Sequence, residues 1–239
     1  MRIDILSVVP ELLESPLNHS IIKRAREKKI VEIYIHNIRN WSKDKYRKVD
    51  DYPFGGEAGM VLMIQPVFDC IRELMAQRNY DEIIYTSPDA PVFNQQMANE
   101  LSLKENIMIL CGHYKGIDQR IRDNLITREI SIGDYVLTGG ELPAMVLVDA
   151  ISRMVPGVLK NQESGETESL EGNLLEYPQY SRPEVWQEKA VPPILLSGNH
   201  QKVDEWRREQ SILRTKERRP DLFERAELSE KERKVYGEE

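Results

Sequence analysis

Strand-like runs alternate with helix-like stretches over roughly the first two thirds of this chain, and no other feature constrains the fold more. The strand-like runs are residues 2–9, 31–37, 82–86, 106–111 and 126–131. The helix-like stretches are residues 65–78, 94–102 and 142–155. Alternating strands and helices are typical of a parallel sheet covered by helices. The sequence therefore predicts the α/β fold class with a parallel sheet.

Residues that favour helix starts support these boundaries. Pro66 and Pro143 stand near the beginning of two predicted helices, where the missing N–H of proline costs no hydrogen bond. Asn94 is a typical N-cap residue for the third. Residues 142–155 are apolar on almost every side, as expected of a helix packed in an interior or against a second subunit.

The composition is that of a globular protein. A chain of 239 residues can bury a real core, and none of its apolar runs approaches the roughly 20 residues of a membrane span. The first sixteen residues lack the basic and apolar regions of a secretory signal. We therefore expect a cytoplasmic enzyme or binding protein without a membrane partner.

The cysteines and histidines indicate neither a disulfide framework nor a zinc site. Cys70 and Cys111 lie far apart, no C-x-x-C pattern occurs, and the four histidines are scattered. Both cysteines fall within apolar patterns, which favours buried thiols. We expect no residue of this chain to be a metal ligand.

The charges are unevenly distributed. The net charge is −7, yet residues 39–48 carry five cations and one aspartate. Residues 202–219 carry seven cations and four acidic residues. Taken alone, either run fits a solvated helix face as well as it fits a binding surface. Two basic runs on an acidic chain favour RNA as a partner, because the cations are concentrated rather than spread.

The composition changes after residue 160. Residues 161–173 are rich in Glu, Ser, Gly and Thr, and we expect a flexible linker there. Residues 174–239 carry prolines, tryptophan and basic helical patterns, which predict a small, mostly helical second domain. A domain of this size buries little by itself, so we expect it to pack on something. Residues 1–160 then form the first domain.

Three predicted strands are followed by loops with unusual chemistry. The loops are Ser87–Asp89, Gly112–Gly116 and Ile132–Glu141. Ligands of open parallel sheets bind beyond the carboxyl ends of the strands, so these loops are expected to converge. Neither the phosphate-loop pattern nor the dinucleotide fingerprint occurs in the chain.

Glycine and proline in these loops let the backbone approach a ligand closely, and exposed backbone groups can read the edge of a purine. The pattern favours a purine ligand with little or no phosphate. The alternative is that the glycines only make tight turns, as in most glycine-rich loops.

A fourth segment, residues 49–60, adds paired aspartates and a second glycine cluster directly after the first basic run. Five motifs now stand in order along the chain. They are DDYPFGGEAGM (50–60), LCGHYKGID (110–118), EISIGDYVLTGGELPAMVLVDAISRMVPGVL (129–159), LLEYPQYSRPEVW (174–186) and VPPILLSGNH (191–200). Together they closely resemble the bacterial tRNA (guanine-N1)-methyltransferases of the SPOUT class, over Met1 to about Glu224.

The resemblance implies properties that the residue patterns do not show. Members of this class have a deep trefoil knot of the backbone, bind S-adenosylmethionine there in a bent form, and are homodimers with an interfacial active site. The implied reaction transfers a methyl group from S-adenosylmethionine to N1 of guanosine 37 in tRNA, next to the anticodon. The implied nucleic-acid partner is tRNA and not DNA. The alternative is a knotted RNA-binding protein that has lost or redirected catalysis.

The resemblance assigns the cofactor site to the three glycine-containing loops and the strand before the first of them. The assigned residues are Tyr85, Thr86, Ser87, Pro88, Gly112, His113, Tyr114, Ile132, Gly133, Asp134, Tyr135, Val136, Leu137, Gly139 and Gly140.

Methylation at guanine N1 requires a base, because N1 carries a proton that must leave. Negative charge then develops on O6, where a cation stabilises it. By resemblance the cation is Arg153, and the base is a carboxylate in the linker. The family usually has aspartate there, in a D-S-F context, whereas the matching run here is TESLEG, so Glu168 is the expected base. Glutamate has the same acid chemistry and a longer arm.

The substrate residues are also carried over from the resemblance. They are Asp50, Gly55, Gly56, Gly59 and Ser169. We expect the segment around Asp50 to hold the flipped guanine, with the carboxylate of Asp50 accepting a hydrogen bond from the base edge.

Besides Glu168, two further sites depart from the family pattern. Lys115 stands in GHYKG where many members have glutamate, and Glu57–Ala58 replaces a commoner Gly-Pro. A charged lysine is neither a base nor a metal ligand, so a Mg²⁺ requirement carried over from the family is weakened here. Lys115 is instead suited to contact a phosphate or the carboxylate of the cofactor.

Overall fold

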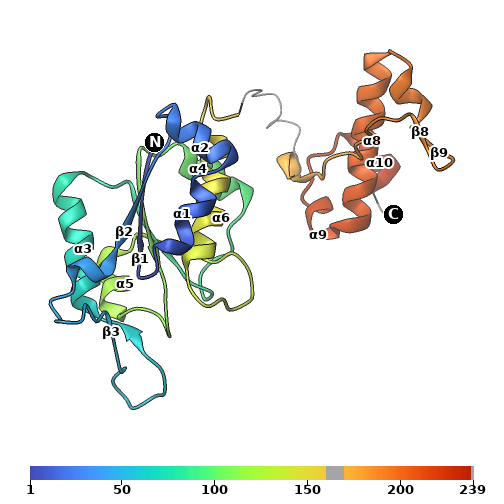
Figure 1. Ribbon diagram of the computed structural model, residues 1–239. Helices are drawn as coiled ribbons and strands as arrows, with labels where there is room; N and C mark the ends of the chain where they lie inside the picture. The colour runs from blue at the N-terminus through green and yellow to red at the C-terminus, as the bar shows by residue number, and fades with distance from the viewer. Residues whose placement is uncertain (160–169, 238–239) are drawn as a thin grey trace. The chain divides into compact units, whose positions relative to one another are not determined.

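The computed structural model describes residues 1–159 and 170–237. It divides the chain into two compact units, Met1–Lys160 and Asn161–Glu239. Each unit has its own arrangement of elements, shown in Figure 1.

The first unit is built on a five-stranded sheet. Its strands are β1 (Arg2–Ser7), β2 (Glu32–Asn37), β5 (Glu82–Thr86), β6 (Asn106–Cys111) and β7 (Arg128–Ile130). Their order in the sheet is β2-β1-β6-β5-β7, and every neighbouring pair is parallel. The predicted α/β class with a parallel sheet is therefore confirmed.

Helices cover both faces of this sheet. They are α1 (Glu11–Leu17), α2 (Ser20–Glu27), α3 (Ile64–Gln77), α4 (Gln95–Ser102), α5 (Gln119–Leu125), α6 (Glu141–Met154) and the 3-10 helix η1 (Ile38–Trp41). Figure 1 shows α3 and α5 on one face and α1, α2, α4 and α6 on the other.

Two hydrophobic cores lie between these layers, and the pleat of the strands divides the side chains between them. Ile107 and Ile109 of β6 belong to the core under α1, α2, α4 and α6, whereas Met108 and Leu110 belong to the core under α3 and α5. Side chains alternate between the two faces of a strand, and both faces are covered. Strands of this kind read as nearly continuous apolar runs, as 106–111 does.

The helix starts lie close to the predicted positions. The side chain of Asn94 accepts a hydrogen bond from Met97 N at 2.9 Å, which confirms it as the N-cap of α4. Helices α3 and α6 begin at Ile64 and Glu141, so that Pro66 and Pro143 lie within the first turn. Proline is accepted there because the first-turn N–H groups have no partner within the helix.

Asp4 in the middle of β1 is a fully buried carboxylate. Arg2 Nε lies 2.7 Å from it, His36 Nε2 lies 2.7 Å from it, and the hydroxyl of Tyr80 donates to it at 2.9 Å. Burial raises the pKa of Asp4, but the hydrogen bonds from His36, Arg2 and Tyr80 outweigh burial and lower the pKa to about 2. The carboxylate therefore joins β1 to β2 and to the segment before β5.

Both cysteines are buried and free, as predicted. Burial raises the pKa of the Cys70 and Cys111 thiols above the ordinary value, so neither is a reactive thiolate.

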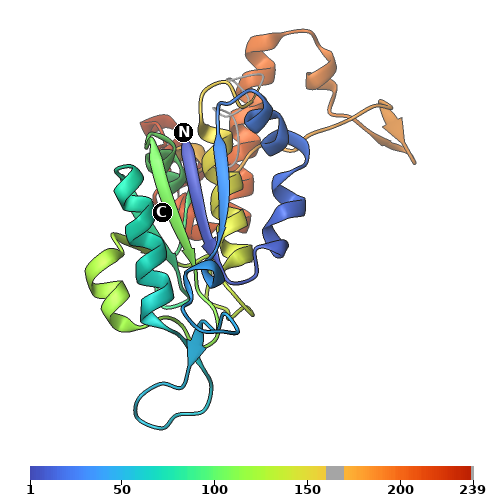
Figure 2. The same ribbon diagram turned by 60° about the vertical axis from the view of Figure 1, so that its left-hand side comes forward.

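A short antiparallel hairpin leaves the first unit after η1. Its strands are β3 (Asp50–Asp51) and β4 (Val61–Leu62), with Asp50 opposite Leu62. In Figure 2 this hairpin extends beyond the carboxyl ends of the sheet strands.

The second unit contains a long helix and several short elements. They are η2 (Glu171–Asn173), β8 (Val185–Trp186), β9 (Lys189–Ala190), η3 (Pro193–Leu196), α8 (His200–Arg218), α9 (Pro220–Phe223) and α10 (Glu230–Tyr236). Its core is small and contains Leu174, Ile212 and Ala226. Arg208 of α8 bonds Glu232 of α10 at 2.8 Å, which ties these two helices together.

Among the helices of residues 1–159 and 170–237, none has the length and apolarity needed to cross a membrane.

Candidate functional site

A pocket of about 360 Å³ lies at the carboxyl edge of the sheet. The loops after β5, β6 and β7 line it together, as the sequence predicted for loops that follow parallel strands. The residues of the predicted cofactor set that line this pocket are Tyr85, Thr86, Ser87, Pro88, Gly112, His113, Tyr114, Ile132, Gly133, Tyr135, Val136, Leu137, Gly139 and Gly140. Asp134 is exposed and is the one member of that set outside the lining.

Backbone contacts bring two of these loops together. Gly140 N donates to Gly112 O at 2.6 Å, and His113 pairs with Gly139 in an antiparallel bridge. A Cβ atom on Gly140 would lie 2.5 Å from Gly112 N and 2.9 Å from Cys111 Cα. Only glycine fits at Gly140, because backbone atoms cannot move aside as the end of a side chain can.

The loop after β5 is held by a network around Arg122 of α5. The guanidinium bonds Asp89 at 3.0 Å, also pairs with Glu129, and lies over the ring of Tyr85, 5.4 Å from its centroid. The bond from Ser87 and the bond from Arg122 lower the pKa of Asp89. Arg122 and Asp89 both line the pocket, so the network shapes its wall.

A buried carboxylate lies beneath the glycine pair. Glu141, the first residue of α6, is only 1% exposed and accepts a hydrogen bond from Ser7 Oγ at 2.6 Å. Its other oxygen, Oε2, lies 3.9 Å from Nδ1 of His113, and neither atom has a hydrogen-bond partner among the described residues. A Cβ atom on Gly139 would meet both Glu141 Oε2 and His113 Nδ1.

The hairpin of β3 and β4 carries the predicted substrate residues Asp50, Gly55, Gly56 and Gly59. Asp50 is partly buried at the base, and the three glycines stand in the exposed turn with φ of 97°, 80° and 104°. The base of the hairpin is bonded to the loop after β6, since Lys115 N donates to Met60 O at 2.9 Å. The substrate segment and the pocket are therefore adjacent parts of one unit.

The structure does not bring the predicted catalytic cation to the pocket of the same chain. Arg153 lies in the last turn of α6, whereas Pro143 in the first turn lines the pocket. Ten residues of helix separate the two by roughly 15 Å. Glu168 and Ser169 lie outside the described residues.

Most cations of the two basic runs are exposed, although Arg39, Arg207, Arg214 and Lys216 are partly buried. In residues 39–48, Lys45, Arg47 and their neighbours from Lys43 to Lys48 face solvent. The second run lies on α8 and just beyond it, where Arg207 pairs with Asp204 at 3.1 Å.

No group of three His, Cys, Asp or Glu side chains within 1–159 and 170–237 is arranged to hold a metal ion.

Sequence patterns missed some of the side chains that build the site. Arg122 and Ser7 stand in ordinary strand or helix patterns, and only their long-range partners reveal their roles. Glu141 had a signal, because an acid directly after a glycine pair begins a helix, where it faces the positive helix end.

Comparison with known proteins agrees with the resemblance found in the sequence motifs. The family model described as tRNA (Guanine-1)-methyltransferase TrmD matches residues 1–225. A tRNA (guanine-N(1)-)-methyltransferase of Azobacteroides pseudotrichonymphae is 60% identical over 222 residues, which cover 93% of this chain and 100% of that protein.

Relatives with the same description occur in other bacteria. That of Bacteroides thetaiotaomicron is 58% identical over 224 residues, covering 94% of this chain and 100% of the relative. That of Clostridioides difficile is 55% identical over 228 residues, covering 95% and 99%. On this evidence the chain belongs to the tRNA (guanine-1)-methyltransferase family, which is of the SPOUT class.

Proposed function

We propose that this protein transfers a methyl group from S-adenosylmethionine to N1 of guanosine 37 in tRNA. The observation that carries the proposal is the pocket formed by the loops after β5, β6 and β7 in a chain of this family. Most residues of its wall are uncharged, and the charged side chains Asp89 and Arg122 are bonded to each other, which suits an adenosine without phosphates.

The pocket residues fit the cofactor. Cβ atoms on Gly112, Gly139 and Gly140 would collide with neighbouring protein atoms, so glycine lets these loops pack closely at the pocket, and backbone N–H and C=O groups there can bond an adenine edge. Tyr85, Thr86, Ser87 and Pro88 also line the pocket, as do His113, Tyr114, Ile132 and Leu137. When bound, S-adenosylmethionine supplies an electrophilic methyl group on a sulfonium. We also propose that the loops form the trefoil knot of the class, which the close pairing of Gly112 with Gly140 supports.

Two residues of this chain carry the chemistry in the proposal. Glu168 removes the proton from guanine N1, and Arg153 stabilises the negative charge that develops on O6. Asp50 and the glycines of the β3–β4 hairpin, with Ser169, hold the guanine. No step requires a metal ion, and Mg²⁺ stays outside the proposed mechanism.

The active site is proposed to form between two copies of the chain. Arg153 and Pro143 are separated by roughly 15 Å along α6. The pocket therefore lacks the predicted catalytic arginine unless a second chain supplies it. Leu142 and Val146, one helical turn apart on α6, are exposed, as are Val136 and Leu137 of the pocket loop. These apolar side chains support a homodimer interface beside the pocket.

The second unit is proposed to be a small helical domain that binds tRNA; most of the linker predicted over residues 161–173 lies outside the described residues, and its end forms η2 (Glu171–Asn173). The basic run of α8 supports this role, together with the exposed run at residues 39–48. Because tRNA is the substrate, we place the protein in the cytoplasm.

The function is tested by incubating the protein with isotopically labelled S-adenosylmethionine and unmodified tRNA, followed by nucleoside analysis. We expect the label in 1-methylguanosine. Glu168→Gln should lower turnover by about 10² or more, with the affinity for S-adenosylmethionine unchanged. Matched changes of Glu166 and Glu171 to Gln test neighbouring carboxylates. Cofactor binding without transfer to any tRNA would instead indicate an RNA-binding protein that has lost catalysis.

A further inference from the structure

One ion pair crosses from the pocket loop to the hairpin. Lys115 Nζ lies 2.7 Å from Oε2 of Glu57, and this bond lowers the pKa of Glu57. Lys115 belongs to the loop after β6 and lines the pocket, whereas Glu57 stands in the turn between β3 and β4. The two residues are 58 positions apart in the sequence, so the contact is made by the fold.

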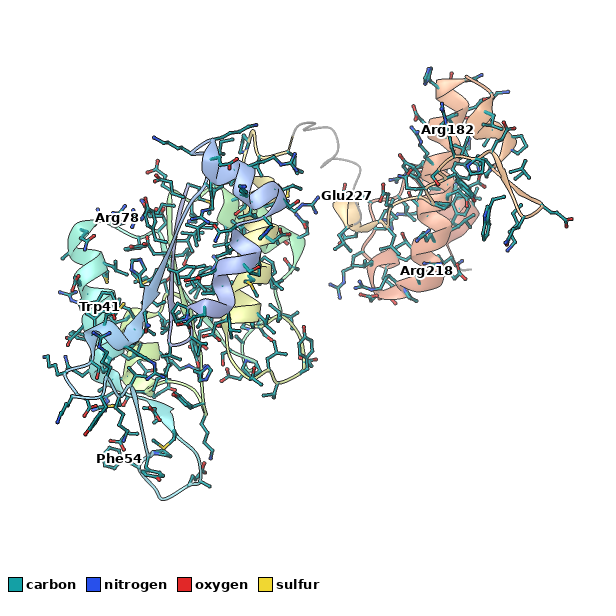
Figure 3. All side chains as sticks on the ribbon, in the orientation of Figure 1. Trp41, Phe54, Arg78, Arg182, Arg218 and Glu227 are labelled. Atoms are coloured by element: carbon teal, nitrogen blue, oxygen red, sulfur yellow. The ribbon has the colours of Figure 1, made fainter. Side chains whose placement is uncertain are left out.

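Backbone bonds hold only the base of the hairpin to this loop. Lys115 N donates to Met60 O at 2.9 Å, and Leu62 N donates to Gly116 O at 3.0 Å. The turn itself has no such support among the described residues, and its aromatic side chains Tyr52 and Phe54 are exposed. Phe54 is labelled at the outer end of the hairpin in Figure 3.

The side chain of Lys115 extends along the turn and holds it in two ways. Its methylene groups pass over Gly59, where a Cβ atom would lie 3.1 Å from both Cδ and Cε of Lys115. Its ammonium then reaches Glu57. A bulkier residue at Gly59 would therefore displace the lysine stem from this path.

We propose that Lys115 is a positioning residue, which fixes the turn of the β3–β4 hairpin at the rim of the pocket through Glu57. The inference rests on the proposed function, because the hairpin is there assigned to holding the target guanine. One side chain lines the pocket and also bonds the turn, so the turn's position is set relative to the cofactor. Small displacements of a substrate-holding segment reduce the rate of transfer.

The two positions also explain each other. Lys115 and Glu57 are two of the positions at which the sequence was found to depart from the pattern of the family it resembles, and the structure joins them as one pair of opposite charge. Both side chains are largely in water, 44% and 76% exposed. The attraction between the two charges is therefore weakened by salt. The pair contributes to the position of the hairpin turn more than to the stability of the fold.

Four variants test the proposal by steady-state methylation of tRNA. Lys115→Met keeps the stem and removes the charge, and Glu57→Gln keeps the size. The third variant combines both changes, and the fourth exchanges the charges as Lys115→Glu with Glu57→Lys, which preserves the combined reach. Lys23→Met is the matched control, because Lys23 forms an exposed ion pair with Glu27 on α2 at 3.8 Å.

Each single change should lower kcat/KM for tRNA by about two- to fivefold, the range for an exposed ion pair. The double variant should lose no more than one single variant, since both changes remove the same interaction. The exchanged pair should recover most of the activity. The dissociation constant of S-adenosylhomocysteine should stay within about twofold in Glu57→Gln. Additive losses, or no recovery on exchange, would overturn the proposal.

A second measurement is independent of activity. Amide hydrogen exchange at Leu62 and at position 115, whose N–H groups donate across the base of the hairpin, should speed up in Lys115→Met and Glu57→Gln, and return toward the original rate in the exchanged pair. The difference should disappear near 1 M salt, where the Debye length is about 3 Å. Unchanged exchange in both single variants would overturn the inference, even if the protein methylates tRNA. Protected amides without any methyl transfer would contradict the proposed function instead.

Discussion

Ser7 at the end of β1 donates a hydrogen bond of 2.6 Å to Glu141 at the start of α6, across 134 positions of sequence. The bond is buried and lies directly beneath the glycine pair of the pocket. It joins β1, which lies between β2 and β6 in the sheet, to the helix whose first turn lines the pocket. A buried carboxylate needs such donors, because desolvation without a partner is costly.

The first prediction concerns this bond. Ser7→Ala should lower the free energy of unfolding by about 1–3 kcal/mol, since it leaves a buried carboxylate oxygen without its donor. Ser102→Ala is the control, because its hydroxyl bonds Asn99 O at the surface. Urea unfolding of both variants gives the comparison. If both variants lose the same small amount of unfolding free energy, the buried bond contributes no more to stability than the bond at the surface.

The second prediction concerns the fit of Gly140. Gly140→Ala should abolish measurable binding of S-adenosylhomocysteine by calorimetry, because the added Cβ meets the backbone of Cys111 and Gly112. The overpacking should also cost about 1–3 kcal/mol of stability. Gly198→Ala is the control, since a Cβ there meets no atom within 4 Å and only its φ of 68° is strained. Normal ligand binding by a folded Gly140→Ala protein would contradict the assigned pocket.

The parallel sheet could be predicted from the sequence because its strands are buried on both faces and appear as short apolar runs between helices. Helix α1 was not predicted from the sequence, because it has only seven residues and Pro16 lies inside it. Helix α5 is equally short, with Ile121 as its buried residue. Their helical form depends on tertiary packing more than on local pattern.

The site was predictable to the extent that it lies in loops after strands. Glycine and proline in those loops give a local signal, and the loops converge because parallel strands end at one edge. The Arg122 network and the Ser7–Glu141 bond join residues far apart in the chain. No spacing pattern encodes such pairs, so only the fold reveals them.

The third prediction concerns the exposed cations. Lys45→Gln with Arg47→Gln should weaken tRNA binding and reduce the slope of log K against log salt by about 2, if each cation contacts a phosphate. Lys23→Gln with Lys28→Gln removes the same charge from α2 and its C-cap residue, and should leave the slope unchanged. Filter binding over a salt series measures both. Equal slopes in the two variants would make residues 39–48 an ordinary solvated surface.

The same test applies to α8, where the structure refines the choice of residues. Changing Arg208 would break its bond to Glu232 and disturb the second unit as well as its charge. Arg214 and Arg218 lie one turn apart and form no ion pair among the described residues. Arg214→Gln with Arg218→Gln should therefore reduce the salt slope by about 2 while the protein stays folded.

The fourth prediction concerns the proposed active site between two copies of the chain. Wild-type protein should sediment as a dimer at micromolar concentration, at twice the chain mass of 27.8 kDa. Ile132→Trp should block the pocket, and Arg153→Ala should remove the cation, so that each variant alone is inactive. Mixed dimers of the two should regain activity, because one of their two sites then combines an intact pocket with an intact arginine.

The control for this experiment is each variant mixed with itself under the same exchange conditions. Mixed dimers that stay inactive would show that pocket and arginine act within one chain. A 27.8 kDa species in active wild-type protein would contradict the dimer itself.

The most direct test of the central claim is methyl transfer to two tRNA transcripts that differ only in having G or A at position 37. With labelled S-adenosylmethionine, we expect label in the G37 transcript alone, located at N1 of that guanine by digestion and mass spectrometry. The proposed base and cation act on the N1 proton and on O6 of guanine, and they cannot serve adenine, which has an amino group at C6 and no proton at N1. Equal labelling of both transcripts, or none in the G37 transcript, would contradict the account.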